Sequence, residues 1–502
     1  MTTPGGLLLV LAVLLPFVGV MAGLVLGGRA AQRVAWATIV GGIGVVVAAG
    51  QALLASGNSL VYLLGGWAPP LGVALRADGL SLAMMAVVAV VVGAIAVYAN
   101  GDFDMQADGR EKRGPLAFWL LLLAVWGSLN LVFVSGDVFT LYVALELLTF
   151  AGVPLVSLDG RGETLQAALR YVLFALVGSM FYLLGVFLLY GAYGTLDIGQ
   201  LAQRVEPGAV AWTAAALMSA GLLAKTALFP LHLWLPPAHA GAPAAASALL
   251  SALVVKGAWF LVLRLWVDVF PSVVTPSAAQ LLGALGAAAI LVGNLVALRQ
   301  ARLKLLIAYS TVAQIGYLFL MFPIVAGLDA VQIDNAWAVT GGLLQVISHA
   351  TAKAAMFMAA GLIYATLGHD RVADLRGVGR ALPMTLTAFA LAGASLIGLP
   401  PSGGFLAKWL LLSAALACGQ WWWALTMLVG GLLTSAYVFM VVVRSMAPAE
   451  AGWTPKKIVP RYQQMAVLFL AVCSFLLGLL ALLPGDPAQI GRAAVPIEGS
   501  QQ

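Results

Sequence analysis

The chain has 502 residues, of which 62% are hydrophobic and only 9% are charged. In soluble globular chains about a quarter of the residues are charged, so this balance excludes a soluble protein and predicts a polytopic protein of the lipid bilayer. The net charge of +6 comes from basic residues scattered over short loops, which does not indicate a nucleic-acid surface. Cys418 and Cys473 lie in separate apolar runs and predict neither a disulfide framework nor a metal site.

The apolar residues fall into segments of about 20 residues, the length of a helix that crosses a bilayer. The sequence therefore predicts an all-α fold with about 14 transmembrane helices. No basic stretch precedes the first apolar run, so it is interpreted as a retained span rather than a cleaved signal peptide. The predicted spans begin near Leu7, Ala35, Leu80, Pro115, Val138, Thr164, Ala209, Ala244, Ala278, Leu303, Ala336, Leu382, Trp421 and Gln464.

Lysine and arginine predict the orientation, because loops on the inner side of a membrane carry an excess of both. Of the 25 basic residues, sixteen lie in the loops of one side, four in those of the other, and five within spans. This distribution predicts a multi-pass protein of the inner (cytoplasmic) membrane with both termini on the external, periplasmic side.

Ionisable residues inside the spans are the candidate functional groups. Of the 19 acidic residues, only Glu146 is predicted to lie in the middle of a span. A charge at the bilayer centre costs at least about 2.5 kcal/mol, and burial disfavours the charged form of a lysine. We interpret these groups as proton carriers, because they cannot all be ionised together without a large electrostatic cost. The other intramembrane ionisable residues are Arg170, Lys225, Lys256, His349, Lys353 and Lys408.

Prolines interrupt two predicted spans. Pro230 follows Lys225 by five residues in the seventh span, and Pro236 lies further on. Pro400 and Pro401 interrupt the twelfth span. Such breaks are tolerated where they line a polar cavity, and each broken span is the fourth of five, which predicts two inverted five-helix repeats. The predicted units are an N-terminal three-helix segment (1–114), the first repeat (115–270), the second repeat (271–445), and an inner loop with the C-terminal helix (446–502).

The order of these residues resembles the antiporter-like membrane subunits, a superfamily shared by respiratory complex I, membrane-bound hydrogenases and the multisubunit Mrp sodium/proton antiporters. The resemblance extends over most of the chain, from about residue 65 to residue 443. Its motifs are Glu146, Arg170-Tyr171, Ala224-Lys225, Pro230-Leu231-His232-Leu233-Trp234-Leu235-Pro236, His239, Ala242-Pro243, Ser247-Ala248, Lys256, Leu303-Lys304-Leu305-Leu306, Ala308-Tyr309-Ser310-Thr311, His349, Lys353, Gly398-Leu399-Pro400, Gly403-Gly404-Phe405 and Lys408. Residues 65–73 and the following Asp78-Gly79-Leu80-Ser81 are similar to the D-type subunit of the Mrp antiporters.

By this resemblance, Glu146 and Lys225 form an intramembrane ion pair that couples the subunit to its neighbour. The alternative interpretation of the pair is a permanent structural salt bridge. Lys256 is implied to be the central proton carrier, although a buried lysine can also be inert and neutral. Arg170 departs from the lysine that the family often has, which argues against a transfer role there because arginine stays protonated.

Further along the chain, His349 and Lys353 stand four residues apart on one helical face, so a proton could pass between them through one water. Lys408 is implied to be the outlet toward the external side. His232 and His239 are candidates for proton uptake from the cytoplasm, and an interfacial histidine that bonds loop backbone is an equally good interpretation.

The sequence thus predicts a proton-translocating subunit of an Mrp-type monovalent cation (sodium)/proton antiporter, acting with other membrane subunits on protons and on sodium or potassium. No nucleotide, flavin, iron–sulfur or haem motif is found, so no cofactor and no catalytic site are expected. One competing interpretation is a proton-pumping arm of a complex I-like NADH-quinone oxidoreductase, a membrane-bound hydrogenase or a carbon-uptake complex. A stand-alone transporter of a small solute and a scaffold with inert lysines also remain open at this point.

Overall fold

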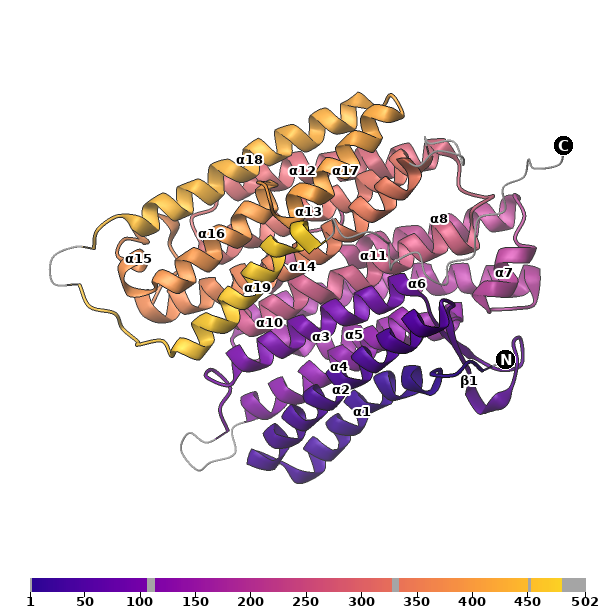
Figure 1. Cartoon of the computed structure of the whole chain (residues 1–502), viewed down its shortest axis with the longest axis horizontal. Helices are drawn as coiled ribbons and strands as arrows, with labels where there is room; N and C mark the ends of the chain where they lie inside the picture. Colours follow the sequence, from indigo (N-terminus) through magenta and orange to yellow (C-terminus); the bar gives the residue numbers. More distant parts are fainter. Residues whose placement is uncertain (1, 106–112, 327–333, 450–452, 481–502) are drawn as a thin grey trace.

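The molecule is a bundle of long helices that run nearly side by side (Figure 1). The structure, a computed structural model, describes residues 2–105, 113–326, 334–449 and 453–480. Within these residues, thirteen helices are long and apolar enough to cross a membrane. The two shorter helices Pro383–Ile397 and Gly403–Ala417 follow each other and together supply one further crossing. The predicted all-helical polytopic fold is therefore confirmed.

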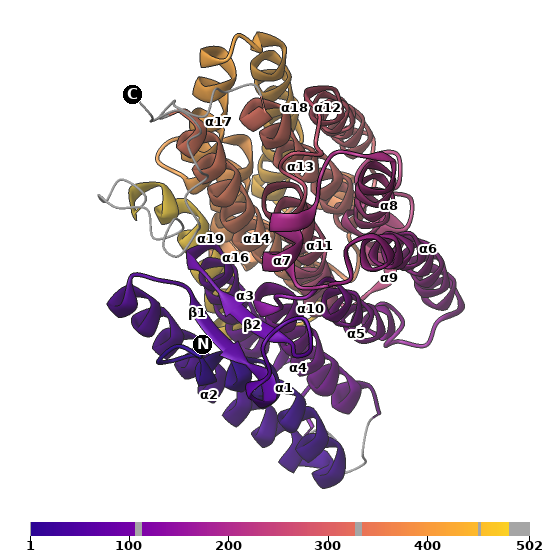
Figure 2. The same ribbon diagram turned by 90° about the vertical axis from the view of Figure 1, so that its right-hand side faces the viewer.

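The first six spans are single helices. They are α1 (Leu7–Leu26), α2 (Gly28–Ser56), α3 (Gly79–Ala99), α4 (Arg113–Val134), α5 (Val138–Val156) and α6 (Gly162–Tyr193), and the short α7 (Ile198–Arg204) follows them. Two short strands, β1 (Leu60–Leu63) and β2 (Ala74–Ala77), pair antiparallel between α2 and α3, with the 3-10 turn η1 (Leu64–Gly66) after β1. This hairpin was not anticipated from the sequence, and it lies beside the N-terminus at one end of the bundle (Figure 2).

The seventh and eighth spans are composite. The seventh consists of α8 (Ala209–Thr226) and α9 (Leu235–Gly241), and the eighth of α10 (Ala244–Leu249), the π-helical turn η2 (Leu250–Val254), α11 (Val255–Arg264) and the π-helical turn η3 (Leu265–Val269). The remaining elements are α12 (Pro276–Leu298), α13 (Leu303–Ala326), α14 (Asp334–Leu367), η4 (Val372–Asp374), α15 (Val378–Ala381), α16 (Pro383–Ile397), α17 (Gly403–Ala417), α18 (Trp421–Met446) and α19 (Arg461–Leu480). The eighth span thus contains two π-helical turns, which the hydropathy of the sequence does not reveal.

The seventh and twelfth spans are broken, as the prolines predicted. Helix α8 ends at Thr226, and Ala227 adopts a left-handed conformation with φ of 57°. The break frees carbonyls that water cannot reach in a bilayer, and Trp234 satisfies one of them by donating from Nε1 to the Ala224 oxygen at 3.0 Å. Helix α16 ends at Ile397, and the next residue, Gly398, has a φ of 94° that is readily available to glycine.

Spans four to eight and nine to thirteen are the helices that the sequence assigns to the two predicted five-helix repeats. Because each predicted repeat has an odd number of spans, the second would cross the membrane in the opposite direction. In the view along the helices, α4, α5, α6 and α8 lie on one side of α10 and α11, whereas α12, α13, α17 and α18 lie on another (Figure 2). The central eighth span is buried from Ala244 to Leu263, so these side chains lie in the interior of the bundle.

Loops that alternate along the chain gather at the two ends of the bundle. One end carries the β hairpin, which is bonded to the loop after α4 through Gly136 N and Ala74 O at 3.0 Å. We call it the hairpin end. The other end carries Arg161, Arg302 and Lys304. There Arg302 forms an ion pair with Asp370 at 3.1 Å, and we call it the basic end.

Candidate functional site

Glu146 and Lys225 meet in the middle of the first repeat. Glu146 lies halfway along α5, and Lys225 lies in the last turn of α8, directly before the helix break. Lys225 Nζ donates to Glu146 Oε1 at 3.2 Å and to Thr149 Oγ1 at 3.1 Å. Ser179 on α6 donates a further hydrogen bond to Glu146. The carboxylate therefore has an ammonium and a hydroxyl as partners, as a buried charge requires.

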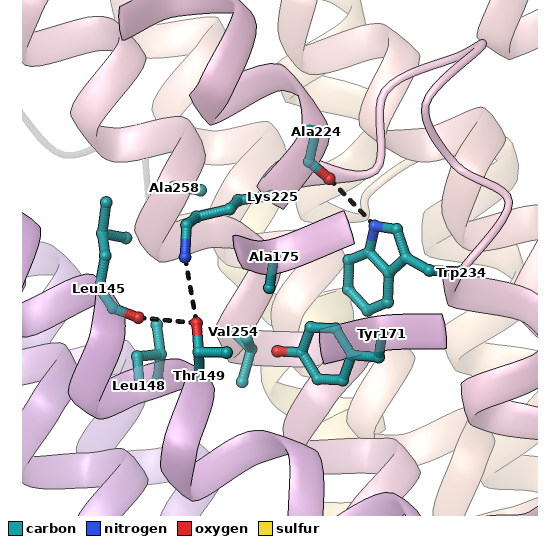
Figure 3. A pocket seen from close by; sticks show the side chains of 10 residues that line it. All are labelled: Leu145, Leu148, Thr149, Tyr171, Ala175, Ala224, Lys225, Trp234, Val254 and Ala258. Atoms are coloured by element: carbon teal, nitrogen blue, oxygen red, sulfur yellow. Dashed lines mark hydrogen bonds between the residues drawn. The ribbon is translucent and has the colours of Figure 1, made fainter. Parts of the chain in front are cut away.

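A small cavity adjoins Lys225 on the side of the eighth span (Figure 3). Its volume is about 10 Å³, close to the least that holds one water molecule. Its lining includes Tyr171, which stacks on the ring of Trp234 at 4.2 Å between ring centroids. Val254 and Ala258 also line it, and they flank Lys256 on the eighth span. The cavity thus lies between Lys225 and the part of the eighth span that carries Lys256.

Lys256 lies at the centre of the eighth span and is only 1% exposed. The π-helical turn η2 ends two residues before it, and Lys256 Nζ donates to the carbonyl oxygen of Ser251 in that turn. A π-helical turn widens the backbone ladder, which makes this oxygen available to the lysine. Within the described residues Lys256 has no carboxylate partner, so its hydrogen bonds are to neutral groups.

Lys353 and His349 lie mid-way along α14, and both are 0% exposed. Lys353 Nζ donates to Ser310 Oγ at 2.8 Å and to the Ile307 oxygen at 3.1 Å, both on α13. The two ring nitrogens of His349 have no hydrogen-bond partner within the described residues. The structure places no direct bond between His349 and Lys353, although their charges interact electrostatically.

We call Lys256, His349 and Lys353 the central group, and His349 its hub. The charges of Lys256, Lys353 and Lys408 all act electrostatically on His349. A neutral imidazole has one donor and one acceptor nitrogen, so it can accept a proton at one face and release one at the other.

Lys408 lies on α17, just after the break in the twelfth span. Its Nζ donates to the oxygens of Leu396 and Ile397 at 2.5 and 3.2 Å, the carbonyls that the end of α16 leaves free. The ammonium also lies 4.3 Å from the centroid of the Tyr317 ring, a cation–π distance. Lys408 therefore bonds the carbonyl oxygens that the helix break exposes, and its charge acts on His349 of the central group.

The two histidines of the seventh span have different surroundings. His239 on α9 is 1% exposed, its ring lies 4.7 Å from that of Phe357, and Lys256, Lys353 and Lys304 act on it electrostatically. Neither ring nitrogen of His239 has a hydrogen-bond partner within the described residues. His232 instead stacks on Phe229 at 5.4 Å, in the break itself. Of these two histidines, His239 is the one on which the central lysines act electrostatically.

A cavity of about 600 Å³ opens at the basic end, next to His239. Residues 240–244, which follow His239 directly, form part of its wall. Arg161, Arg302 and Lys304 each donate to one carbonyl oxygen of residues 240–242, at 3.1, 3.1 and 2.9 Å. Lys304 in the first turn of α13, Arg302 just before it and Arg161 just before α6 thus hold the end of α9 in place beside the cavity.

Asp102 carries a carboxyl group on the wall of this cavity, after the end of α3. Partial desolvation raises the pKa of Asp102, against the hydrogen bond from Gln463 and the positive charge of Lys457. Gln463 Nε2 donates to Asp102 Oδ1 at 3.3 Å. The cavity wall is assembled from α3, the α9–α10 loop, α13, α14 and the segment before α19, so it could not be located from sequence.

Several hydroxyl groups of the site could not be recognised from the sequence as functional residues. They are Thr149, Ser179, Ser251, Tyr317 and Tyr437. Each lies on a different helix from the ionisable group that it contacts or supports, apart from Ser251, and a lone hydroxyl in an apolar run gives no signal of its own. Pro230, Pro236, Pro400 and Pro401 lie in or beside the two breaks. Among the described residues, no group of three His, Cys, Asp or Glu side chains could hold a metal ion.

The family described as "NADH:quinone oxidoreductase/Mrp antiporter, TM" matches residues 135–434. The chain belongs to this family. It is 37% identical over 415 residues to NADH-quinone oxidoreductase subunit N of Desulforudis audaxviator, with 80% of each chain covered. It is 31% identical over 382 residues to the D-type subunit of the Na(+)/H(+) antiporter of Alkalihalophilus pseudofirmus, and the match covers 75% of this chain and 74% of the relative.

Solved members of multisubunit complexes share the fold of this antiporter-family chain. A chain of the Mrp complex from Dietzia sp. aligns with a TM-score of 0.83 at 24% identity and covers 95% of both chains. A chain of respiratory complex I from Thermus thermophilus aligns with a TM-score of 0.73 at 26% identity and covers 94% of this chain and 97% of its own length. The protein is accordingly an integral membrane, ion-translocating subunit of the Mrp or complex I type, with other membrane subunits as partners.

Proposed function

We propose that this chain is the proton-translocating subunit of an Mrp-type sodium/proton antiporter. The supporting observation is the row of buried ionisable groups from the Glu146–Lys225 pair through Lys256 and the His349 hub to Lys408. Buried ion pairs contribute little to stability, so retention of this row is better explained by charge movement than by folding.

The Glu146–Lys225 pair acts as a switch that controls whether Lys225 is protonated. While Glu146 lies 3.2 Å from Lys225, its charge favours the ammonium form. Separation of the carboxylate from the lysine removes that support, and a desolvated ammonium then releases its proton toward Lys256. The helix break beside Lys225 and the partial exposure of Glu146 provide the freedom for such a movement, because a broken helix can bend and Glu146 faces the edge of the bundle.

Proton uptake is assigned to His239 and the 600 Å³ cavity at the basic end. The cavity reaches the residues next to His239, and His239 interacts with Lys256 and Lys353. The basic end then corresponds to the cytoplasm, by the distribution of lysine and arginine. The N-terminus at the hairpin end faces the external side of the cytoplasmic membrane, and Lys408 serves as the outlet to that side.

A second candidate is a proton-pumping subunit in the membrane arm of a complex I-like enzyme. The 37% identity to NADH-quinone oxidoreductase subunit N favours it. The same buried lysines would serve an antiporter and a complex I-like enzyme, because both complexes move protons across the bilayer. The difference lies in what supplies the energy, which is the work of other subunits.

The test is proton movement in membrane vesicles that contain the intact complex, measured with a pH-sensitive dye. Glu146→Ala, Lys225→Ala and Lys256→Ala should each lower the rate at least tenfold. Ser128→Ala is the matched control, because Ser128 is fully buried but bonds only within its own helix, to the Ala124 oxygen at 2.7 Å. Full activity of the three variants in assembled complexes would rule out the proton-path proposal.

The same vesicles separate the two candidates. A sodium gradient should drive proton movement in an antiporter, without any electron donor. In a complex I-like machine, proton movement should instead require a reduced donor and a quinone, and a sodium gradient alone should have no effect.

A further inference from the structure

Two adjacent hydroxyl residues of helix α13 contact the surroundings of the two central lysines. Ser310 accepts a hydrogen bond from Lys353 of α14 at 2.8 Å. The next residue, Thr311, bonds the hydroxyl of Ser251 at 2.9 Å, and Ser251 belongs to the turn whose carbonyl holds Lys256. Successive residues of a helix point about 100° apart, so this adjacent pair can serve two different neighbours.

Ser310 also forms a hydrogen bond with Tyr437 of α18. The two hydroxyl oxygens lie 2.6 Å apart, and both residues are 0% exposed. An ammonium group can only donate, so Ser310 must accept from Lys353 and direct its own hydrogen to Tyr437. This order fixes the hydroxyl of Ser310 as an acceptor for the charged lysine.

The two sides of α13 also share one backbone group. The carbonyl oxygen of Ile307 accepts from Lys353 Nζ at 3.1 Å and from Thr311 Oγ1 at 3.0 Å. The positions of Lys353 and of the Ser251 turn are therefore fixed relative to the same helical turn. A shift of α13 would alter the surroundings of both lysines at once.

We propose that Ser310 and Thr311 are positioning residues of the proton path, and that Tyr437 acts through Ser310. The inference rests on the proposed function, because it assumes that Lys353 and Lys256 carry protons. Ser310 and Tyr437 stabilise the charged form of Lys353, whereas Thr311 holds the turn that orients Lys256. The hydroxyls do not carry the proton themselves; it passes between the lysines and the histidine hub.

The arrangement satisfies both protonation states of Lys353. When the lysine loses its proton, the neutral amine gains a lone pair, and Ser310 can turn its hydrogen toward it while accepting from Tyr437. The other charged or titratable groups that act on this region are Lys256, Lys408 of α17, His349 of α14 and His239 of α9. They set the electrostatic background, and the Ser310–Tyr437 chain supplies the hydrogen bonds.

The first experiment measures the pH dependence of proton movement by the intact complex in vesicles. Ser310→Ala removes an acceptor from a charged donor and should shift the pH of half-maximal rate toward acid by about one unit, a tenfold loss in proton affinity. Tyr437→Phe should shift it in the same direction by a smaller amount. The double variant should behave like Ser310→Ala alone, because the hydrogen bonds of the described residues link Tyr437 to Lys353 through Ser310.

Two controls accompany these variants. Tyr182→Phe removes an equally buried tyrosine hydroxyl, which donates to the Val138 oxygen at 3.1 Å, and should leave the profile unchanged. Ser310→Thr keeps the hydroxyl and should restore the wild-type profile. If Ser310→Ala prevents assembly of the complex, the pH profile of Tyr437→Phe still tests the inference. This variant loses only the hydroxyl and keeps the aromatic ring that fills the space, so it should assemble.

The second experiment tests the other side of α13. Thr311→Val should lower the rate several-fold, Thr311→Ser should restore it, and Ser251→Ala should add nothing to the effect of Thr311→Val. Unshifted profiles in Ser310→Ala and Tyr437→Phe, or additive effects in either double variant, would overturn the inference. Lys353→Met and Lys256→Met tell this outcome apart from failure of the proposed function: if both retain full activity, the proton path itself is wrong.

Discussion

Lys225 and Lys408 lie beside the two helix breaks, but only Lys225 has a carboxylate partner among the described residues. Lys225 pairs with Glu146 at 3.2 Å, whereas Lys408 bonds the oxygens of Leu396 and Ile397 and faces the Tyr317 ring. The two lysines thus have different charge environments. Lys225 has an anion beside it, whereas Lys408 is surrounded by neutral groups.

We predict that a carboxylate installed near Lys408 slows transport. Gln314 Nε2 donates to the Leu396 oxygen at 3.2 Å, the same oxygen that Lys408 contacts, so its side chain ends close to the ammonium. Gln314→Glu should trap the proton on Lys408 and lower the rate of proton movement in vesicles at least tenfold. Gln345→Glu, one hydrogen bond further away, should have a smaller effect. An unchanged rate in Gln314→Glu would contradict an outlet role for Lys408.

Removal of Glu146 alone should be worse for stability than removal of the whole pair. An unpaired buried charge costs roughly 3 to 5 kcal/mol, whereas replacement of both partners is often nearly neutral. Glu146→Gln should therefore lower the thermal midpoint of the purified complex, and Glu146→Gln/Lys225→Met should recover most of the loss. Neither variant should transport protons. Equal midpoints in the single and double variants would argue that the pair is not charged.

Gly221 sets the distance between α6 and α8, one turn before Lys225. A side chain at Gly221 would meet the carbonyl oxygen of Gly178 at 2.2 Å, too close for any rotamer to relieve. Gly221→Ala should push α8 away from Ser179 and Glu146 and lower proton movement at least tenfold in assembled complexes. Gly191→Ala is the control on α6, because nothing lies within 4 Å of its added methyl group. A fully active Gly221→Ala variant would show that the close approach is dispensable.

The stability of the basic end should depend on the protonation of Asp102. Its pKa is raised in the folded protein, so the fold binds this proton more tightly than the unfolded chain does. Stability from this group is present at low pH and is lost as the pH rises from about 4, the unfolded value, through the raised value. Asp102→Asn cannot ionise and keeps an acceptor for Gln463, so its thermal midpoint should exceed that of the wild type at pH 8. The two midpoints should converge at pH 4, and a difference independent of pH would exclude the carboxyl as the cause.

The number of spans and the two breaks could be predicted from sequence because both have local causes. A span needs only a sufficient length of apolar residues, and a proline removes a backbone donor wherever it stands. The mid-span positions of Glu146, Lys256 and Lys353 follow from the same count along each helix. The hairpin of β1 and β2 was missed because its two strands are only four residues long. They lie in a loop between two spans, where the hydropathy pattern gives no signal for a strand.

The partners of these groups could not be predicted in the same way. His349 and Lys353 share a helical face, and a transfer between them remains a prediction, but the structure gives the hydrogen bonds of Lys353 to α13 instead. The sequence treated His232 and His239 alike, and only the packing separates them. The chain therefore determined by itself which ionisable groups lie in the bilayer, since apolar length and charge are properties of single segments. The tertiary structure decided which of them have an anion, a hydroxyl or a cavity beside them, because those neighbours come from helices far apart in sequence and are set by how the two repeats pack.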